Sequence, residues 1–203
     1  LFESAILKTS VMDDAFRSRY LSKPGQEGVF EGRAVVFEGP EDYRARIEDP
    51  ALAIDEDSIL VMRGCGTVGY PGSAEVVNMR PPAALIAQGI EALPTLGDGR
   101  QSGTSGSPSI LNASPESAVG GRLALLRSGD RIRIDLPARR VDVLLELDEL
   151  EARAAQLSPP ALTNQTPWQE LHRSTVGQLA SGACLEAALA YREVGRRLPR
   201  HSH

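Results

Sequence analysis

Cysteine is scarce in this chain, which has only two among 203 residues, Cys65 and Cys184. They lie far apart in unlike sequence, so they match neither a zinc or iron-sulfur binding pattern nor a disulfide framework. A metal cluster in this protein would therefore need ligands from outside the chain. We expect Cys65 to be a small buried residue, and Cys184 to lie in the core on a helix face.

Aromatic residues and an excess of positive charge are also missing. Aromatic side chains make up 4% of the sequence, and 22 basic residues face 27 acidic ones, for a formal net charge of -5. Nucleic-acid surfaces need positive charge and stacking platforms, so we expect no nucleic-acid partner. The three histidines, His172, His201 and His203, all lie near the end of the chain, which argues against a serine hydrolase. His172 is expected to face solvent.

Long hydrophobic runs are absent as well. No apolar stretch approaches the ~20 residues that cross a bilayer, and the first residues lack the plan of a signal peptide. We therefore expect no membrane partner and a cytoplasmic location. The chain opens at Leu1 with sequence typical of the middle of a longer protein, so we expect it to be a fragment.

Glycine and hydroxyl residues are abundant in two stretches. Residues 97–108 read Gly-Asp-Gly-Arg-Gln-Ser-Gly-Thr-Ser-Gly-Ser-Pro, and residues 64–75 form a second glycine-rich loop that ends at Glu75. Such loops let backbone amides and serine oxygens approach a small polar ligand. The stretch at 97–108 lacks a nucleophile elbow and a Gly-Lys-Ser/Thr sequence, so it matches neither an α/β-hydrolase nor a phosphate-binding loop. From composition alone, a flexible linker remains the alternative.

The hydrophobic pattern predicts a mixed α/β domain, because 41% hydrophobic content in 203 residues can fill one core. An antiparallel meander in its second half is expected to close a barrel-like sheet with packed helices. The predicted helices cover residues 13–21, 81–93 and 148–157, the last capped by Asp148. The predicted strands cover residues 33–37, 58–63, 122–126, 131–136 and 141–147.

Residues 158–203 are predicted to form a helical tail. Thr166 should cap a helix that ends at Gly182, with an apolar stripe formed by Trp168, Leu171, Val176 and Leu179. A second amphipathic stretch covers residues 184–194, and a basic, frayed end covers residues 196–203. We expect this tail to dock on the domain of residues 1–157 or on a partner subunit.

Several motifs in register resemble one enzyme family. They are the stretch at 97–104, Ser-Pro-Glu at 114–116, Gly-Gly at 120–121 and Gly-Asp-Arg-Ile at 129–132. In order and spacing they resemble the C-terminal swivelling domain of the dihydroxy-acid and phosphogluconate dehydratase family. Residues 69–79 and 103–112 look closer to its sugar-acid branch, which includes arabinonate and xylonate dehydratases.

The resemblance implies a hydro-lyase that converts a sugar acid (aldonate) into a 2-keto-3-deoxy acid. Such enzymes use an iron-sulfur cluster on the departing 3-hydroxyl and Mg²⁺ on the carboxylate and 2-hydroxyl. Ser102 matches the family's base at carbon 2, and Glu75 matches its magnesium ligand from this domain. Thr104 could orient the base or the substrate, or only satisfy its own loop. A serine is a strong enough base only beside a cation.

Four further residues are weaker substrate-binding candidates. Asp98 and Arg100 flank the serine, but an internal ion pair that holds the loop explains them equally well. Tyr70 and Asn78 lie near Glu75, where packing or turn formation is the simpler reading.

The resemblance also implies what is missing. Cluster cysteines and the other magnesium ligands belong to an N-terminal domain that this chain does not contain, so the chain alone should be inactive, and family members are typically homo-oligomers. A branched-chain dihydroxy acid is the alternative substrate, but Gln101 and Asn112 stand where that branch tends to have an aromatic residue and a histidine. A non-catalytic binding or assembly module is the alternative from another functional class.

Overall fold

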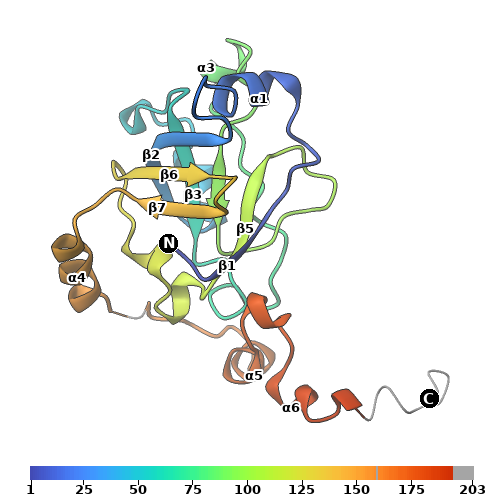
Figure 1. Ribbon diagram of the computed structural model, residues 1–203. Helices are drawn as coiled ribbons and strands as arrows, with labels where there is room; N and C mark the ends of the chain where they lie inside the picture. Colours follow the sequence, from blue (N-terminus) through green and yellow to red (C-terminus); the bar gives the residue numbers. More distant parts are fainter. Residues whose placement is uncertain (159, 194–203) are drawn as a thin grey trace.

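The computed structural model describes residues 1–158 and 160–193, and its centre is a seven-stranded sheet that curls into a half-barrel (Figure 1). The strand order is β1-β5-β4-β3-β2-β6-β7, in which β5, β4, β3 and β2 run parallel and the other three antiparallel to their neighbours. This confirms the predicted mixed α/β, barrel-like class. The strands are β1 (Ser4–Leu7), β2 (Val29–Glu38), β3 (Ser58–Arg63), β4 (Thr95–Gly97), β5 (Ser109–Ser114), β6 (Arg131–Asp135) and β7 (Arg140–Val143).

Short helices surround the sheet. Figure 1 shows α1 and α3 at one end of it and α5 at the other. The α-helices are α1 (Asp14–Tyr20), α2 (Pro40–Arg46), α3 (Ala83–Ile86), α4 (Leu147–Gln156), α5 (Pro167–Thr175) and α6 (Glu186–Leu189). The 3₁₀ turns are η1 (Pro50–Leu52), η2 (Ser117–Val119), η3 (Arg122–Leu125) and η4 (Leu179–Ser181).

The core lies on the central strands. Ile59, Leu60, Val61 and Met62 of β3 are completely buried, as the unbroken apolar run of this strand predicts for a position in the middle of a parallel sheet. An aromatic group formed by Phe16, Tyr20 and Phe30 packs α1 on β2. The sheet is therefore a rigid base for the loops that leave its ends.

Two elements differ from the sequence prediction. The helix expected at 81–93 is only the single turn α3, because the chain reverses at Gly89, whose φ of +82° is left-handed. The strand expected at 122–126 is the 3₁₀ turn η3. There Leu123 and Leu126, three residues apart, both point inward, and the Arg63 guanidinium donates to the carbonyls of this turn.

The boundaries of β7 and α4 also differ. Strand β7 ends at Val143, and α4 begins at Leu147, whose side chain is exposed. Glu146 is the N-cap, and the predicted cap, Asp148, lies inside the first turn, where its negative charge favours the helix dipole.

In the tail, the Thr166 cap is confirmed, since its hydroxyl accepts from the Gln169 amide at 3.2 Å. The helix ends at Thr175, and Gly182 instead closes η4. Of the predicted stripe, Val176 is buried but Trp168 is 77% exposed.

The second stretch of the tail and two single residues differ as well. Helix α6 is a single turn, and the predicted basic end at 196–203 lies outside the described residues. Cys184 is exposed rather than in the core, because it lies in the turn between η4 and α6. His172 is half-buried rather than solvent-facing.

Among residues 1–158 and 160–193, no helix is both long enough and apolar enough to span a membrane.

Candidate active site at the carboxyl ends of the parallel strands

Three loops meet at one edge of the sheet. Because β3, β4 and β5 are parallel, the loops that follow them, at 64–75, 98–107 and 115–121, all leave from the same edge. This edge is where open α/β sheets bind ligands. The two glycine-rich loops singled out from the sequence are two of these three.

Asp98, the first residue after β4, joins the starts of all three loops. Its buried carboxylate accepts hydrogen bonds from the amides of Gly64 (3.1 Å), Cys65 (2.9 Å) and Ser117 (2.9 Å), and from the Ser117 hydroxyl. Burial raises the pKa of Asp98, and the donated hydrogen bonds oppose that shift. The ion pair expected here is replaced by amide contacts, and Asp98 supports the loops from beneath.

Glu116 has a role in the third loop similar to that of Asp98, and it was not among the site residues predicted from the sequence. Its buried carboxylate accepts from the amides of Val68 (3.0 Å) and Gly69 (2.8 Å) and from the Thr67 hydroxyl (3.0 Å). A Cβ at Gly66 would collide with this carboxylate, so glycine is required there. The Ser-Pro-Glu motif was the signal that could have identified it.

Ser102 and Thr104 form a hydroxyl pair on an exposed turn. Their hydroxyl oxygens are 2.9 Å apart, and the Thr104 amide donates to Ser102 Oγ at 3.3 Å. The turn is closed by the Ser105 amide, which donates to the Ser102 carbonyl at 3.1 Å. Both predicted catalytic residues therefore lie together, and the Thr104 amide is a donor to the serine oxygen.

Arg100 connects this turn to Glu75. Its guanidinium lies 3.1 Å from Glu75 Oε1 and donates to the Ser73 carbonyl at 3.2 Å, and its own carbonyl accepts from the Val77 amide at 3.0 Å. The internal ion pair expected for Arg100 is thus present, with Glu75 as the partner. Both side chains are almost half exposed, so the pair contributes little to stability.

Tyr70 and Asn78 lie on either side of Glu75 in the sequence. The Asn78 side-chain amide donates to the Glu75 carbonyl at 2.8 Å, which is the turn-forming role that the sequence suggested. The Tyr70 hydroxyl lies 3.5 Å from Glu41 Oε1, toward α2. Asn78 orders the backbone beside Glu75, whereas Tyr70 faces another element.

Glu75 is chemically suited to Mg²⁺, and the two cysteines are not suited to a cluster. The Glu75 carboxylate supplies hard, partly exposed oxygens. Cys65 is buried, which raises the pKa of its thiol, and Cys184 is exposed. In the part of the chain that the structure describes, no group of three or more histidines, cysteines or acidic residues could hold a metal ion. A complete metal site therefore needs ligands beyond these residues.

Two buried side-chain amide oxygens have no donor. Gln101 Oε1 and Asn112 Oδ1 are buried and have no hydrogen-bond partner among the described residues. The other end of the Gln101 amide donates to the Ser105 and Ser109 hydroxyls at 2.9 and 3.1 Å.

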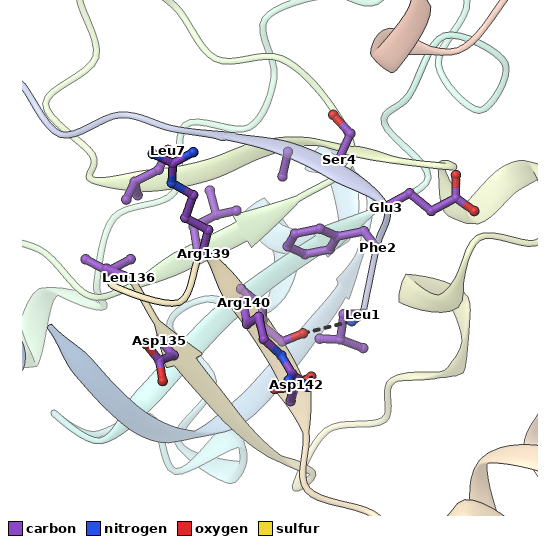
Figure 2. Close-up of a pocket in the computed structure, with 13 residues that line it drawn as sticks. Leu1, Phe2, Glu3, Ser4, Leu7, Asp135, Leu136, Arg139, Arg140 and Asp142 are labelled. Atoms are coloured by element: carbon purple, nitrogen blue, oxygen red, sulfur yellow. Dashed lines mark hydrogen bonds and ion pairs between the residues drawn. The ribbon is translucent and has the colours of Figure 1, made fainter. Parts of the chain in front are cut away.

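A pocket of about 650 Å³ lies elsewhere (Figure 2). It opens between β1 and the hairpin of β6 and β7, where the Leu1 nitrogen donates to the Val141 carbonyl at 2.8 Å. None of the site residues predicted from the sequence lines it. A pocket of about 410 Å³ borders Asn78 and residues 105–107, next to the serine turn.

Comparison with known proteins gives one family. Residues 1–183 match the family described as dihydroxy-acid/6-phosphogluconate dehydratase C-terminal. A D-xylonate dehydratase of Caulobacter vibrioides is 58% identical over 203 residues, 100% of this chain and 34% of the relative.

Two further relatives carry different names. An L-arabinonate dehydratase of Rhizobium leguminosarum is 42% identical over 158 residues, 78% of this chain and 27% of the relative. A dihydroxy-acid dehydratase of Wolinella succinogenes is 33% identical over 188 residues, 92% of this chain and 31% of the relative. The chain thus spans about a third of the length of each of these relatives.

Proposed function

The chain belongs to the dihydroxy-acid/6-phosphogluconate dehydratase family, and from that premise we propose that it is the C-terminal part of a sugar-acid dehydratase. The complete enzyme would remove water from an aldonate and release a 2-keto-3-deoxy acid. The observation that carries this proposal is the exposed Ser102–Thr104 pair, which lies on the same sheet edge as Glu75 and is joined to it through Arg100. Relatives named as D-xylonate and L-arabinonate dehydratases support it.

In the proposed reaction, Ser102 takes the proton from carbon 2 of the substrate. A serine oxygen can do so only if its negative charge is stabilised, and here the Thr104 amide and hydroxyl both lie within hydrogen-bond reach of Oγ. The 3-hydroxyl then leaves the neighbouring carbon as hydroxide, which gives an enol that tautomerises to the keto acid. The proton held by Ser102 combines with this hydroxide to give water. Ser102 is the base, and Thr104 stabilises its anionic form.

Glu75 would hold Mg²⁺ together with residues beyond this chain. When bound, the magnesium ion would stabilise negative charge on the substrate carboxylate. Glu75 Oε1 is paired with Arg100, so Arg100 would hold the carboxylate in place. The iron-sulfur cluster implied by the family does not fit Cys65 and Cys184, and we assign it to the part of the enzyme outside this chain.

The substrate we propose is polyhydroxylated. Gln101 and Asn112 stand where the branched-chain branch of the family tends to have an aromatic residue and a histidine, which supports a polyhydroxylated substrate over a branched-chain acid. The relative from Rhizobium leguminosarum, named for L-arabinonate, supports the same branch.

The partners we propose are the N-terminal part of the same protein and a further copy of it. The first is supported by the length of the relatives, of which this chain spans about a third. The association with a further copy stays a prediction. The same holds for the cytoplasmic location and for the division into residues 1–157 and a tail.

The proposal is tested by measuring 2-keto acid release from pentonates and hexonates with the complete enzyme and its Ser102→Ala variant. We expect release from at least one aldonate, and a fall of about 10²–10⁴-fold in kcat when the serine is removed, since that is the usual contribution of a general base. Ser10→Ala, in the exposed turn after β1, is the matched control and should keep the wild-type rate. A fully active Ser102→Ala enzyme would rule out the serine as base.

A further inference from the structure

Lys8 is bound to the turn that carries Ser102, although the two are 94 positions apart in the sequence. Its ammonium nitrogen donates to the backbone carbonyls of Ser102 (3.2 Å), Gly103 (2.9 Å) and Ser105. A lysine ammonium has three N–H donors, so these three carbonyls occupy its full donor capacity. A single cation therefore holds one side of the turn.

The sheet register brings Lys8 to this position. Strand β1 pairs antiparallel with β5, with Leu7 opposite Ile110, and the Lys8 amide continues the ladder by donating to the Ser109 carbonyl at 3.1 Å. Lys8 thus lies beside the point where the turn enters β5, and its side chain extends back over residues 102–105.

Little else holds this turn from outside. A Cβ placed on Gly103 or Gly106 would meet no described atom within 4 Å. Within residues 1–158 and 160–193, Lys8 is the only side chain from outside the loop that makes hydrogen bonds to the backbone of residues 102–105. Removing it should therefore loosen the turn without disturbing the core.

The peptide between Gly103 and Thr104 connects Lys8 to the serine oxygen. Its carbonyl oxygen accepts from the Lys8 ammonium at 2.9 Å. Its N–H points in the opposite direction, because the peptide is trans, and donates to Ser102 Oγ at 3.3 Å. A cation at the carbonyl oxygen polarises the peptide and makes the N–H a stronger donor, because hydrogen bonds in a chain reinforce one another. The positive charge of Lys8 therefore reaches Ser102 through one peptide group.

We propose that Lys8 is a positioning residue for Ser102. It fixes the turn at 102–105 and strengthens the Thr104 N–H that stabilises negative charge on Ser102 Oγ. Lys8 itself does not contact the substrate. This inference rests on the proposed function for its catalytic consequence, whereas the contact between Lys8 and the turn does not depend on that function.

The first test is steady-state kinetics of the complete enzyme with Lys8→Met and Lys8→Arg. Loss of the charge should lower kcat by about 10–100-fold, less than the loss of a donor that contacts the reacting charge directly, and leave KM within about twofold. Arginine keeps the charge and should restore part of kcat. Lys23→Met, which removes the same charge from the loop after α1, is the matched control and should change neither constant.

The second test is hydrogen–deuterium exchange of residues 102–106 in the same proteins. The amides of residues 102–106 should exchange faster in Lys8→Met than in wild type, whereas exchange in β3 should be unchanged. Lys23→Met should match wild type in both segments. An unchanged kcat, a change confined to KM, or unchanged exchange in Lys8→Met would overturn the inference. If wild type releases no keto acid, the proposed function fails, and the exchange result alone decides whether Lys8 holds the turn.

Discussion

At the scale of single residues, the loops of the candidate site are held by buried carboxylates that bind backbone amides. Asp98 accepts hydrogen bonds from the amides of Gly64, Cys65 and Ser117. Glu116 accepts from the amides of Val68 and Gly69. All five amides lie in the loops that follow β3 and β5. The sequence could not reveal this role, because an amide donor is present at almost every residue. Ser102, Thr104 and Glu75 could be predicted as site residues, because they stand in motifs that resemble those of the family.

Asp98→Asn is expected to destabilise the protein by about 2–4 kcal/mol, because an amide nitrogen would face amide donors and leave them unsatisfied. Chemical denaturation monitored by circular dichroism measures this loss. Asp142→Asn is the control, since Asp142 is partly exposed and pairs with Arg140 at the surface, and this change should cost less than about 1 kcal/mol. Equal stability of the two variants would show that the contacts of Asp98 are not important for the fold.

At the scale of helices and strands, the sequence predicted the elements whose pattern is strictly local. Strand β6 alternates buried and exposed residues, and the Asp13 and Thr166 caps mark α1 and α5. The predictions for 81–93 and 122–126 failed because a left-handed glycine and a distant arginine, Arg63, determine the backbone there. The parallel order of β2 to β5 depends on pairing between distant segments, which no local pattern records.

Helix α4 provides the prediction at this scale. Its Arg153 is buried and donates to both oxygens of Asp130, at 2.6 and 3.0 Å, and to the Leu125 carbonyl at 2.9 Å. Arg153→Met should therefore cost about 3–5 kcal/mol, because it leaves the buried Asp130 carboxylate without its cation.

Thermal unfolding of Arg153→Met measures this cost. The control is Arg127→Met, which removes an exposed contact to Glu149 at 3.7 Å and should lower the free energy of unfolding by less than about 1 kcal/mol. A loss of similar size in both variants would contradict the role assigned to the buried pair.

At the scale of the whole molecule, residues 173–178 contact the loops at the site edge of the sheet. Gln178 donates to Glu116 Oε1 at 2.9 Å and accepts from the Glu116 amide at 2.8 Å, and Arg173 donates to the Val68 carbonyl at 2.8 Å. These contacts join residues 173–178 to the loops that follow β3 and β5. The exposed Trp168 and Leu171 leave room for the subunit contact that was the other prediction.

Gln178→Ala should release this docking locally. Hydrogen–deuterium exchange should rise at 173–185 and in the loop at 64–75, with little change in global stability, since local opening costs less than global unfolding. Gln156→Ala, at the exposed end of α4, is the control and should leave both segments unchanged. Unchanged exchange in Gln178→Ala would mean that Arg173 and Val176 suffice to hold the tail.

The convergence of the loop starts on Asp98 also has a use in protein engineering. Its hydrogen bonds fix the first residues of the loops at Gly64, Cys65 and Ser117. Other contacts hold the segments beyond these residues. A chimera that exchanges other loop segments between relatives, and keeps the Ser102–Thr104 pair and its Lys8 contacts, would leave this foundation intact. The fold therefore combines a fixed frame with loop segments that can be exchanged without changing the core.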